Sequence, residues 1–537
     1  AGVRLVARET ERMMLTRASK RVLRSDCLVA VPVMGEAGSG KSRLVSEFLQ
    51  QLGDEGERWQ LDIGACSALG LPVAYEPLVE LVRARVRAHE ASDDDDLRAR
   101  LQRLPGLAAE ASVPAEVAQR RLRTLLRMLG LHATDGEASV RPATDAEQQA
   151  AFEAFSHLIR ASCAIAPVVL VIEAMQWAKG PTLELIAHLA RTCDDVPLLL
   201  IPILRSDRAD AVLAALALPA ARTTPIDLGP LEIDEVGTLV EALRPGAQVP
   251  EPLVEAIAAL SDGLPGQIEA VVLALTEDGC FEHAGDHWHV DVKRATAAAK
   301  GRSLGDLVLQ RINRMAPNER GLIEALAAAG PAAPRGVLAA MLGREPSERE
   351  FDAAKQQRLL VEVRSPQFRG QRAFTLRQAQ VGDVVLGALP VALRAELHRR
   401  AARWLLDWRE PRPAGFGALL AHHFMVAGDE AEATRCVVQN AEASLRAMAN
   451  RDAYDAYTAA VELAAGWVDK RPDDVEAKRV WVAALLSVAE LGLRLGETTV
   501  ALEASERADA IAAQRDDVLG DLRVRALILR GDTLRAS

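Results

Sequence analysis

The chain is poor in aromatic residues and in cysteine, and it lacks the patterns of a secreted or membrane protein. Only 4% of its 537 residues are Phe, Trp or Tyr, although 49% are hydrophobic. Its six cysteines form no C-x-x-C pair, which predicts reduced thiols and a cytoplasmic protein rather than a disulfide framework. There is no signal peptide and no apolar run of about 18 residues, so we expect neither secretion nor a membrane partner.

An excess of positive charge is also missing. The formal net charge is −11 and no long basic stripe stands out, so we expect no direct contact with nucleic acid. Residues 93–96 are consecutive aspartates, which predict a solvated loop rather than a cation site, because adjacent side chains converge poorly on one ion. The length predicts about three to five domains. The first residue is not Met and residues 531–537 resemble the start of a helix, so we expect a piece of a longer protein.

The motif with the clearest chemistry is GEAGSGKS at residues 35–42, which has the phosphate-loop spacing G-x-x-x-x-G-K-[ST]. An apolar run at residues 27–34 predicts a buried strand before it, and residues 42–50 predict an amphipathic helix after it. We expect Lys41 to reach the β- and γ-phosphates and the Ser42 hydroxyl to bind Mg²⁺. Backbone N–H groups at a helix N-terminus complete such a site. The predicted contacts of the loop are Gly35, Glu36, Ala37, Gly38, Ser39, Gly40, Lys41, Ser42 and Arg43.

Two further apolar runs end in charged residues. Residues 168–172 lead into Glu173, and residues 198–204 lead into Arg205. Because ligands lie at the carboxyl ends of parallel strands, Glu173 is predicted to hold Mg²⁺ with Ser42, and Arg205 to sense the γ-phosphate. The alternatives are a solvated strand end for Glu173 and a surface salt bridge for Arg205.

Residues 280–292 predict a hairpin that turns at residues 285–286. Its polar side chains Cys280, His283, His287 and His289 have a spacing that matches no common structural zinc site, so we expect them to face water.

From about residue 418 the pattern is one of antiparallel helical pairs. Turns that pair Gly with an acid recur at residues 496 and 531, which are 35 residues apart and close to the tetratricopeptide period of about 34. Such pairs predict a solenoid whose concave face binds a protein or a small-molecule signal. Adjacent histidines at His422 and His423 do not share a helix face, which favours packing over metal binding.

Together these motifs resemble the STAND class of signal-transducing ATPases. The pattern is that of the ATPase module in large LuxR-type regulators, some bacterial serine/threonine kinases and adenylate-cyclase-linked proteins, and it covers nearly the whole chain. The matching segments are residues 3–15 (near the adenine in the family), 35–48 (phosphate loop), 168–178 (Walker B), 198–207 (sensor strand), 228–231 and 263–265 (junction and base-contacting turn), 303–342 (winged helix) and 420–464 (helical repeats).

The resemblance implies the fold and the domain order. The fold class is multidomain α/β plus α. Residues 1–228 would form a P-loop nucleotide-binding domain with a parallel sheet, and residues 229–300 a helical domain with the hairpin. Residues 301–395 would form a winged helix, and residues 396–537 a truncated tetratricopeptide-like α-solenoid.

The resemblance also implies the ligands and further contacts. ATP or ADP with Mg²⁺ would touch Val6, Arg8 and Pro265, and also Gln378, which takes the place of a winged-helix His. In the family, ADP holds a closed state, a signal on the repeats loosens it, and ATP drives assembly of copies or release of an effector. Hydrolysis then resets the switch.

Departures from the family pattern predict slow or absent hydrolysis. Ala174 and Lys179 stand where the family usually has Asp, Ala7 where it usually has Gly, and Gln378 cannot carry the charge of a His. The leading hypothesis is a nucleotide-controlled signalling switch with weak ATPase activity, in which Lys41, Glu173 and Arg205 would be catalytic. The alternative is a non-hydrolysing scaffold that holds its nucleotide and works through its repeats.

Overall fold

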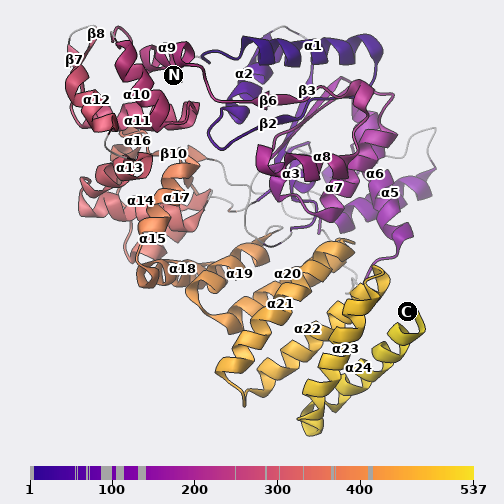
Figure 1. Cartoon of the computed structure of the whole chain (residues 1–537). Helices are drawn as coiled ribbons and strands as arrows, with labels where there is room; N and C mark the ends of the chain where they lie inside the picture. The colour runs from indigo at the N-terminus through magenta and orange to yellow at the C-terminus, as the bar shows by residue number, and fades with distance from the viewer. Residues whose placement is uncertain are drawn as a thin grey trace.

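The computed structural model describes most of the chain. The described residues are 5–54, 56, 58–67, 71, 73–85, 99–104, 114–130, 141–247, 249–284, 287–300, 303–330, 332–363, 368, 371–408 and 415–536. The aspartates at residues 93–96 and the turn at residues 285–286 lie outside them. Figure 1 shows an α/β region that leads into two helical regions and then into a stack of helices, which returns beneath the α/β region.

A parallel sheet forms the centre of the N-terminal part. Its strands pair in the order β1-β5-β4-β3, and β2 pairs with β6, all in parallel. The amide of Leu204 donates to the carbonyl of Val33 at 3.1 Å, so the two sets of strands adjoin. The strands are β1 (Val29–Ala30), β2 (Val33–Gly35), β3 (Gln60–Ala65), β4 (Val168–Glu173), β5 (Leu198–Pro202) and β6 (Ile226–Leu228).

The single strand predicted at residues 27–34 is therefore wrong in detail. The structure has two short strands, β1 and β2, on either side of Pro32. Proline has no N–H to donate to a ladder, which explains the interruption. The Pro32 carbonyl still accepts from the Ile226 amide at 2.8 Å, so the chain keeps its direction toward the phosphate loop.

Helices cover both faces of this sheet, and β4 supplies side chains to both cores. Val169 and Val171 pack with α1 and α2 on one face, whereas Leu170 and Ile172 pack with α3, α5, α6, α7 and α8 on the other. This alternation is the period of two expected of a strand buried on both sides. The helices are α1 (Glu9–Ser25), α2 (Lys41–Asp54), α3 (Glu76–Arg85), α5 (Ala115–Met128), α6 (Asp145–Cys163), α7 (Gly180–Thr192) and α8 (Ala209–Leu216), with short 3₁₀ turns η1 (Met175–Trp177), η2 (Ser206–Arg208) and η3 (Ala220–Arg222).

Two smaller regions follow the sheet. The first has its own core and consists of α9 (Ile233–Leu243), α10 (Glu251–Leu260), α11 (Pro265–Glu277), the hairpin β7 (Phe281–Ala284) and β8 (His287–Val290), and α12 (Val292–Lys300). The second holds an antiparallel sheet in the order β10-β11-β9. Its elements are α13 (Leu304–Asn313), α14 (Pro317–Ala329), β9 (Ala333–Pro334), α15 (Arg335–Leu342), α16 (Glu348–Gln356), β10 (Leu360–Val363), β11 (Ala373–Leu376), α17 (Ala379–Ala388) and α18 (Val391–Leu406).

The C-terminal part is a stack in which each helix packs on the next (Figure 1). Fully buried alanines such as Ala433, Ala441 and Ala460 let neighbouring helices approach closely. With the parallel sheet, this large helical region confirms the predicted fold class of α/β plus α. The helices are α19 (Phe416–Ala427), α20 (Glu430–Arg446), α21 (Asn450–Lys470), α22 (Val475–Arg494), α23 (Thr498–Ala513) and α24 (Asp516–Ala536).

In the described ranges, no single helix has both the length and the apolar composition to cross a membrane. The helices α10 and α11 reach such a composition only as a pair, across a bend of 117°. The six cysteines are buried.

Candidate functional site

The loop at residues 35–42 connects β2 to the first turn of α2, as the sequence predicts. Gly38 and Gly40 have φ values of 87° and 95°, a region that side chains with a Cβ rarely adopt. These conformations let the backbone wrap around an anion without a side chain in the way. Because α2 begins at Lys41, the positive end of its dipole lies at the same loop.

Lys41 lies against this loop. Its Nζ donates to the carbonyl of Gly35 at 2.8 Å and to that of Glu36 at 2.7 Å. Burial lowers the pKa of Lys41, and the nearby positive charge of Arg205 lowers it further. The negative charges of Asp207, Asp227 and Glu36 oppose this shift, and a bound phosphate group would oppose it as well.

Ser42 and Glu173 meet although they are 131 residues apart. The Ser42 hydroxyl donates to a carboxylate oxygen of Glu173 at 3.3 Å. Glu173 ends β4, and burial raises its pKa while the Ser42 hydrogen bond opposes that rise. A hydroxyl and a carboxylate are hard oxygen donors, which Mg²⁺ prefers, so the donor set fits this ion.

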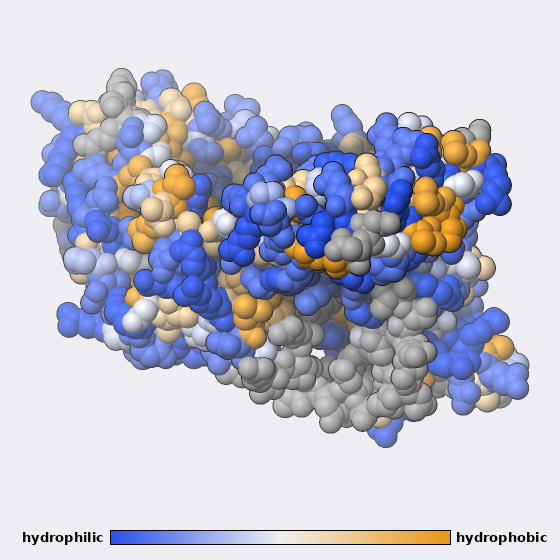
Figure 2. Space-filling model, turned by 90° about the horizontal axis from the view of Figure 1, so that it is seen from below, coloured by the Kyte–Doolittle hydropathy of each residue, from blue (hydrophilic) through white to orange (hydrophobic). Residues whose placement is uncertain are grey.

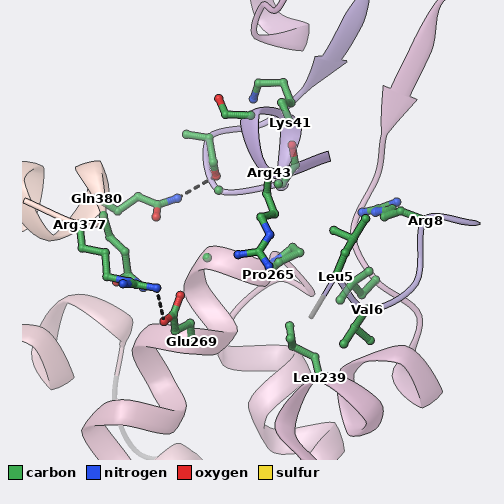
Figure 3. Close-up of a pocket in the computed structure, with 18 of the residues that line it drawn as sticks. Leu5, Val6, Arg8, Lys41, Arg43, Leu239, Pro265, Glu269, Arg377 and Gln380 are labelled. Atoms are coloured by element: carbon green, nitrogen blue, oxygen red, sulfur yellow. Dashed lines mark hydrogen bonds and ion pairs between the residues drawn. The ribbon is translucent and has the colours of Figure 1, made fainter. Parts of the chain in front are cut away.

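A cavity of about 630 Å³ opens in front of the loop. Figure 3 shows apolar side chains of Leu5, Val6 and Leu239 on one side and the charged side chains of Lys41 and Arg43 on another. This size and this division suit a nucleotide, whose base is largely apolar and whose phosphates are charged. The lining residues come from the α/β region and from both regions that follow it: Leu5, Val6, Arg8, Ala37, Gly38, Ser39, Gly40, Lys41, Ser42, Arg43, Leu231, Leu239, Leu243, Pro265, Gly266, Glu269, Val361, Arg377, Gln378 and Gln380.

Several buried polar atoms of this lining have no hydrogen-bond partner within the described residues. They are the Ser39 hydroxyl, Nε2 of Gln378 and Nε of Arg8. Buried donors without partners are rare in native proteins and mark places where a ligand or water completes the bonding. Their position around the cavity is what a polar ligand requires.

The predicted contacts fall into two groups. Val6, Arg8, residues 37–43, Pro265 and Gln378 all line the cavity. Gly35, Glu36, Glu173 and Arg205 are not in its lining, although Lys41 bonds the first two and Ser42 bonds Glu173.

Arg205 lies apart from the cavity in this structure. It forms an ion pair with Asp207 at 3.1 Å, and its side chain is 45% exposed. It lies close enough to Lys41 to lower the pKa of that amine. The role of Arg205 at the γ-phosphate stays a prediction.

Sequence reasoning missed the side chains that close the cavity from outside the α/β region. The Gln380 amide donates to the carbonyl of Ala37 at 2.7 Å, and the amide of Gly266 donates to the carbonyl of Gly38 at 2.9 Å. Glu269 and Arg377 pair at 3.4 Å beside them (Figure 3). Gln380 follows the predicted contact Gln378 by two residues: both line the cavity, and Gln380 in addition bonds the loop.

The structure also describes two of the residues that depart from the family pattern, Ala174 and Lys179. Ala174 follows Glu173 with a φ of 55°, a conformation that Asp and Asn adopt more readily than Ala. Lys179 precedes α7 and is outside the cavity lining.

The sequence predicts that the histidines of the hairpin face water and that those of the helical stack pack rather than bind a metal. The hairpin β7–β8 exists as predicted, but no group of at least three His, Cys, Asp or Glu suited to a metal ion occurs among the described residues. His423 is buried and its Nδ1 lies 2.9 Å from Nδ1 of His398, which is consistent with packing.

The parallel sheet, the phosphate loop and the Ser42–Glu173 pair define a P-loop nucleoside triphosphatase. Residues 4–201 match the family model of the AAA ATPase domain, which supports a nucleotide-binding ATPase in this part of the chain. The predicted membership in the STAND class of P-loop ATPases agrees with this match. We call this part the AAA domain.

Distant relatives were also found. An uncharacterized protein of Rhizobium meliloti is 24% identical over 415 residues, which make up 74% of this chain but only 37% of that relative. The chain thus spans little more than a third of that relative.

Among solved structures, one similar chain is a STAND protein with a tetratricopeptide repeat sensor from Pyrococcus horikoshii. The match covers 99% of this chain and 80% of that chain, with 12% identity and a TM-score of 0.37. Another is the ORC1 protein of Aeropyrum pernix, solved in complex with DNA. That match covers 72% of this chain and 94% of the ORC1 chain, with 11% identity and a TM-score of 0.33. Both likenesses are distant.

Proposed function

We propose that this chain is a nucleotide-controlled signalling switch. ATP or ADP with Mg²⁺ binds in the cavity at the phosphate loop, and the nucleotide decides whether the regions around the loop stay closed. A signal on the helical stack, α19–α24, would bias that choice. Assembly of several copies in the ATP state is part of the same proposal.

The observation that supports the proposal is that residues of two other regions form hydrogen bonds with the phosphate loop. Gly266 bonds Gly38, and Gln380 bonds Ala37, in each case through a loop carbonyl. A ligand held by this loop therefore touches three parts of the chain at once. Its differential contacts in open and closed forms are what a switch needs.

The chain's own residues have distinct roles in this proposal. Lys41 neutralises phosphate charge, and the amides of the loop orient the phosphates. Ser42 and Glu173 hold Mg²⁺, which would stabilise charge on the phosphate oxygens. Val6 and Pro265 enclose the base, and Gln378 donates its unpartnered amide toward the ligand.

A scaffold that keeps its nucleotide is the second candidate. The observation that favours it is Ala174, which supplies no carboxylate next to Glu173 to orient a water molecule. A switch turns its nucleotide over by exchange or hydrolysis, whereas a scaffold retains it.

The nucleotide content of the purified protein tests both candidates. We expect stoichiometric ADP or ATP after denaturation and ion-exchange chromatography, and its loss in Lys41→Ala. The matched control is Lys20→Ala, an exposed lysine on α1, which should keep the nucleotide.

Exchange of the bound nucleotide for a fluorescent ADP analogue within minutes supports the switch, and retention over hours supports the scaffold. If Lys41→Ala binds Mg-ATP as well as the parent, or if the parent binds none, the proposal is refuted.

A further inference from the structure

The turn between α20 and α21 inserts into the AAA domain, away from the nucleotide cavity. Met448 and Ala449 are 1% and 0% exposed and belong to the same hydrophobic core as β4 and α6. The Arg446 carbonyl accepts from Nε of Arg127 at 3.1 Å. The helical stack therefore contributes core residues to the AAA domain. The hydrogen bond between Arg127 and Arg446 joins residues that are 319 positions apart in the sequence.

A paired amide fixes the position of this turn. The side chain of Asn450 donates from Nδ2 to the Ala143 carbonyl at 2.7 Å and accepts from the Ala143 amide at 2.8 Å. Both bonds are buried. Two reciprocal bonds to one backbone residue specify the docking geometry, because neither survives a shift of one residue.

Asp452 is the unusual group of the turn. It is 0% exposed, and neither of its carboxylate oxygens has a hydrogen-bond partner within the described residues. A buried ionised carboxylate without partners is strongly unfavourable, so such a group takes up a proton instead. A protonated carboxyl group still has one O–H to donate.

Two carboxylates near Asp452 act in the same direction as its burial. Among the described residues, the negative charges of Asp455 on α21 and Glu184 on α7 raise its pKa, and the positive charge of Lys179 lowers it. Burial, followed by these two negative neighbours, raises the pKa of Asp452 to about 8. The neighbouring Arg451 pairs instead with Glu497 at 3.0 Å and with Asp455 at 3.5 Å.

The buried hydroxyl of Tyr75, which precedes α3, also lies near Asp452. Burial raises the pKa of Tyr75 as well, so this hydroxyl stays neutral. The pocket for the turn is thus built from the start of α3, the start of α6 and the start of α7, and it offers a neutral carboxyl group an uncharged polar neighbour.

We propose that the α20–α21 turn, residues 446–452, is a proton-dependent plug: it docks into the AAA domain with the Asp452 carboxyl protonated, and loss of that proton loosens it. Docking takes up one proton, so the docking equilibrium weakens about tenfold per pH unit up to about pH 8. Docking weakens as the pH rises because the pKa of the Asp452 carboxyl group is ordinary when the turn is undocked and raised when the turn is docked.

The plug reaches the segment that follows Glu173. Gly180, the first residue of α7, packs against Arg451, and Lys179 lies beside Asp452. The path from Glu173 to α7 is short and passes through Ala174 and η1. An effect of the plug on nucleotide exchange rests on the proposed function, whereas docking of the plug does not.

Hydrogen exchange of the full chain, followed by mass spectrometry at pH 6, 7 and 8, tests the plug. After correction for the intrinsic exchange rate, the opening equilibrium of residues 446–452 should rise about tenfold from pH 6 to 7 and about fivefold from pH 7 to 8 in the parent. In Asp452→Asn it should stay constant. Asp469→Asn, an exposed carboxylate on the same helix, should behave like the parent.

Two further variants distinguish the effect of the Asp452 proton from that of the Asn450 hydrogen bonds. Asn450→Ala removes both bonds to Ala143, so residues 446–452 should be open at every pH. Glu184→Gln lowers the pKa of Asp452 by removing a negative neighbour, so part of the protection should persist above pH 8, even if Asp452→Asn does not fold.

A pH-independent opening in the parent, or the same pH dependence in Asp452→Asn, overturns the proton coupling. Full protection in Asn450→Ala overturns the plug. None of these readouts needs bound nucleotide, so a failure of nucleotide binding leaves the test intact.

Discussion

Replacing Gly266 by Ala would test whether contact with α11 holds the phosphate loop closed. A Cβ at this position would lie 3.1 Å from Cα of Gly38 and 3.3 Å from its carbonyl oxygen. Both neighbours are backbone atoms, so α11 and the loop must separate by a few tenths of an ångström. The 2.9 Å bond between the same two residues then lengthens.

The size of the effect follows from that bond. Losing one backbone hydrogen bond costs about 0.5–1.5 kcal/mol, which corresponds to about 2- to 12-fold faster release of nucleotide. Stability should not fall in parallel, because Ala favours a helix over Gly by up to about 1 kcal/mol. Gly266 is preferable to Gly38 for this test, since Gly38 has a positive φ and any substitution there adds strain.

Stopped-flow dissociation of a fluorescent ADP analogue measures the release rate, and urea unfolding measures stability. Gly237→Ala is the matched control: it makes the same change on α9, where the new Cβ meets only Val254 carbons at 3.7 and 3.8 Å. If Gly266→Ala releases nucleotide at the rate of the parent and of Gly237→Ala, the contact does not hold the loop closed and the reasoning fails.

Two other predictions concern hydrolysis and pH. Ala174→Asp restores an acid beside Glu173 in a conformation that Asp tolerates, so single-turnover ATP hydrolysis should rise about 10- to 100-fold, and an unchanged rate would remove Ala174 as the cause of slow turnover. Burial lowers the pKa of His398 to about 4, so this histidine is neutral when folded and charged when unfolded between that value and about 6.5. The contribution of His398 to the free energy of unfolding should therefore fall by about 3 kcal/mol as pH drops from 6.5 to 4. The difference in urea midpoint between the parent and His398→Phe should show this change across the range, and a difference that stays constant with pH would contradict it.

The sequence predicted those parts of the site that are contiguous or lie at strand ends. The phosphate loop has local geometry, so its residues could be assigned from glycine spacing alone. Glu173 could be assigned because parallel strands bring their carboxyl ends to one edge, and its bond to Ser42 agrees with that rule.

Contacts between regions could not be predicted in the same way. Which of Gln378 and Gln380 reaches the loop depends on how α17 is rotated and docked, and one sequence contains no such information. Asn450 and Asp452 showed no signal either, because a polar residue in the first turn of a helix usually faces solvent. Their burial follows only from the return of the helical stack to the AAA domain.

The two core residues supplied by the α20–α21 turn have a consequence for how the chain folds. Met448 and Ala449 complete a core that also contains Leu170 and Ile172 of β4. A fragment that ends at residue 228 would lack them and would expose the apolar pocket that they fill, at a cost of about 1.5–3 kcal/mol for the methionine alone. The segment that matches the AAA family model therefore does not contain every residue of the core around β4. During synthesis, the core of the AAA domain is completed only after Met448 and Ala449 have left the ribosome.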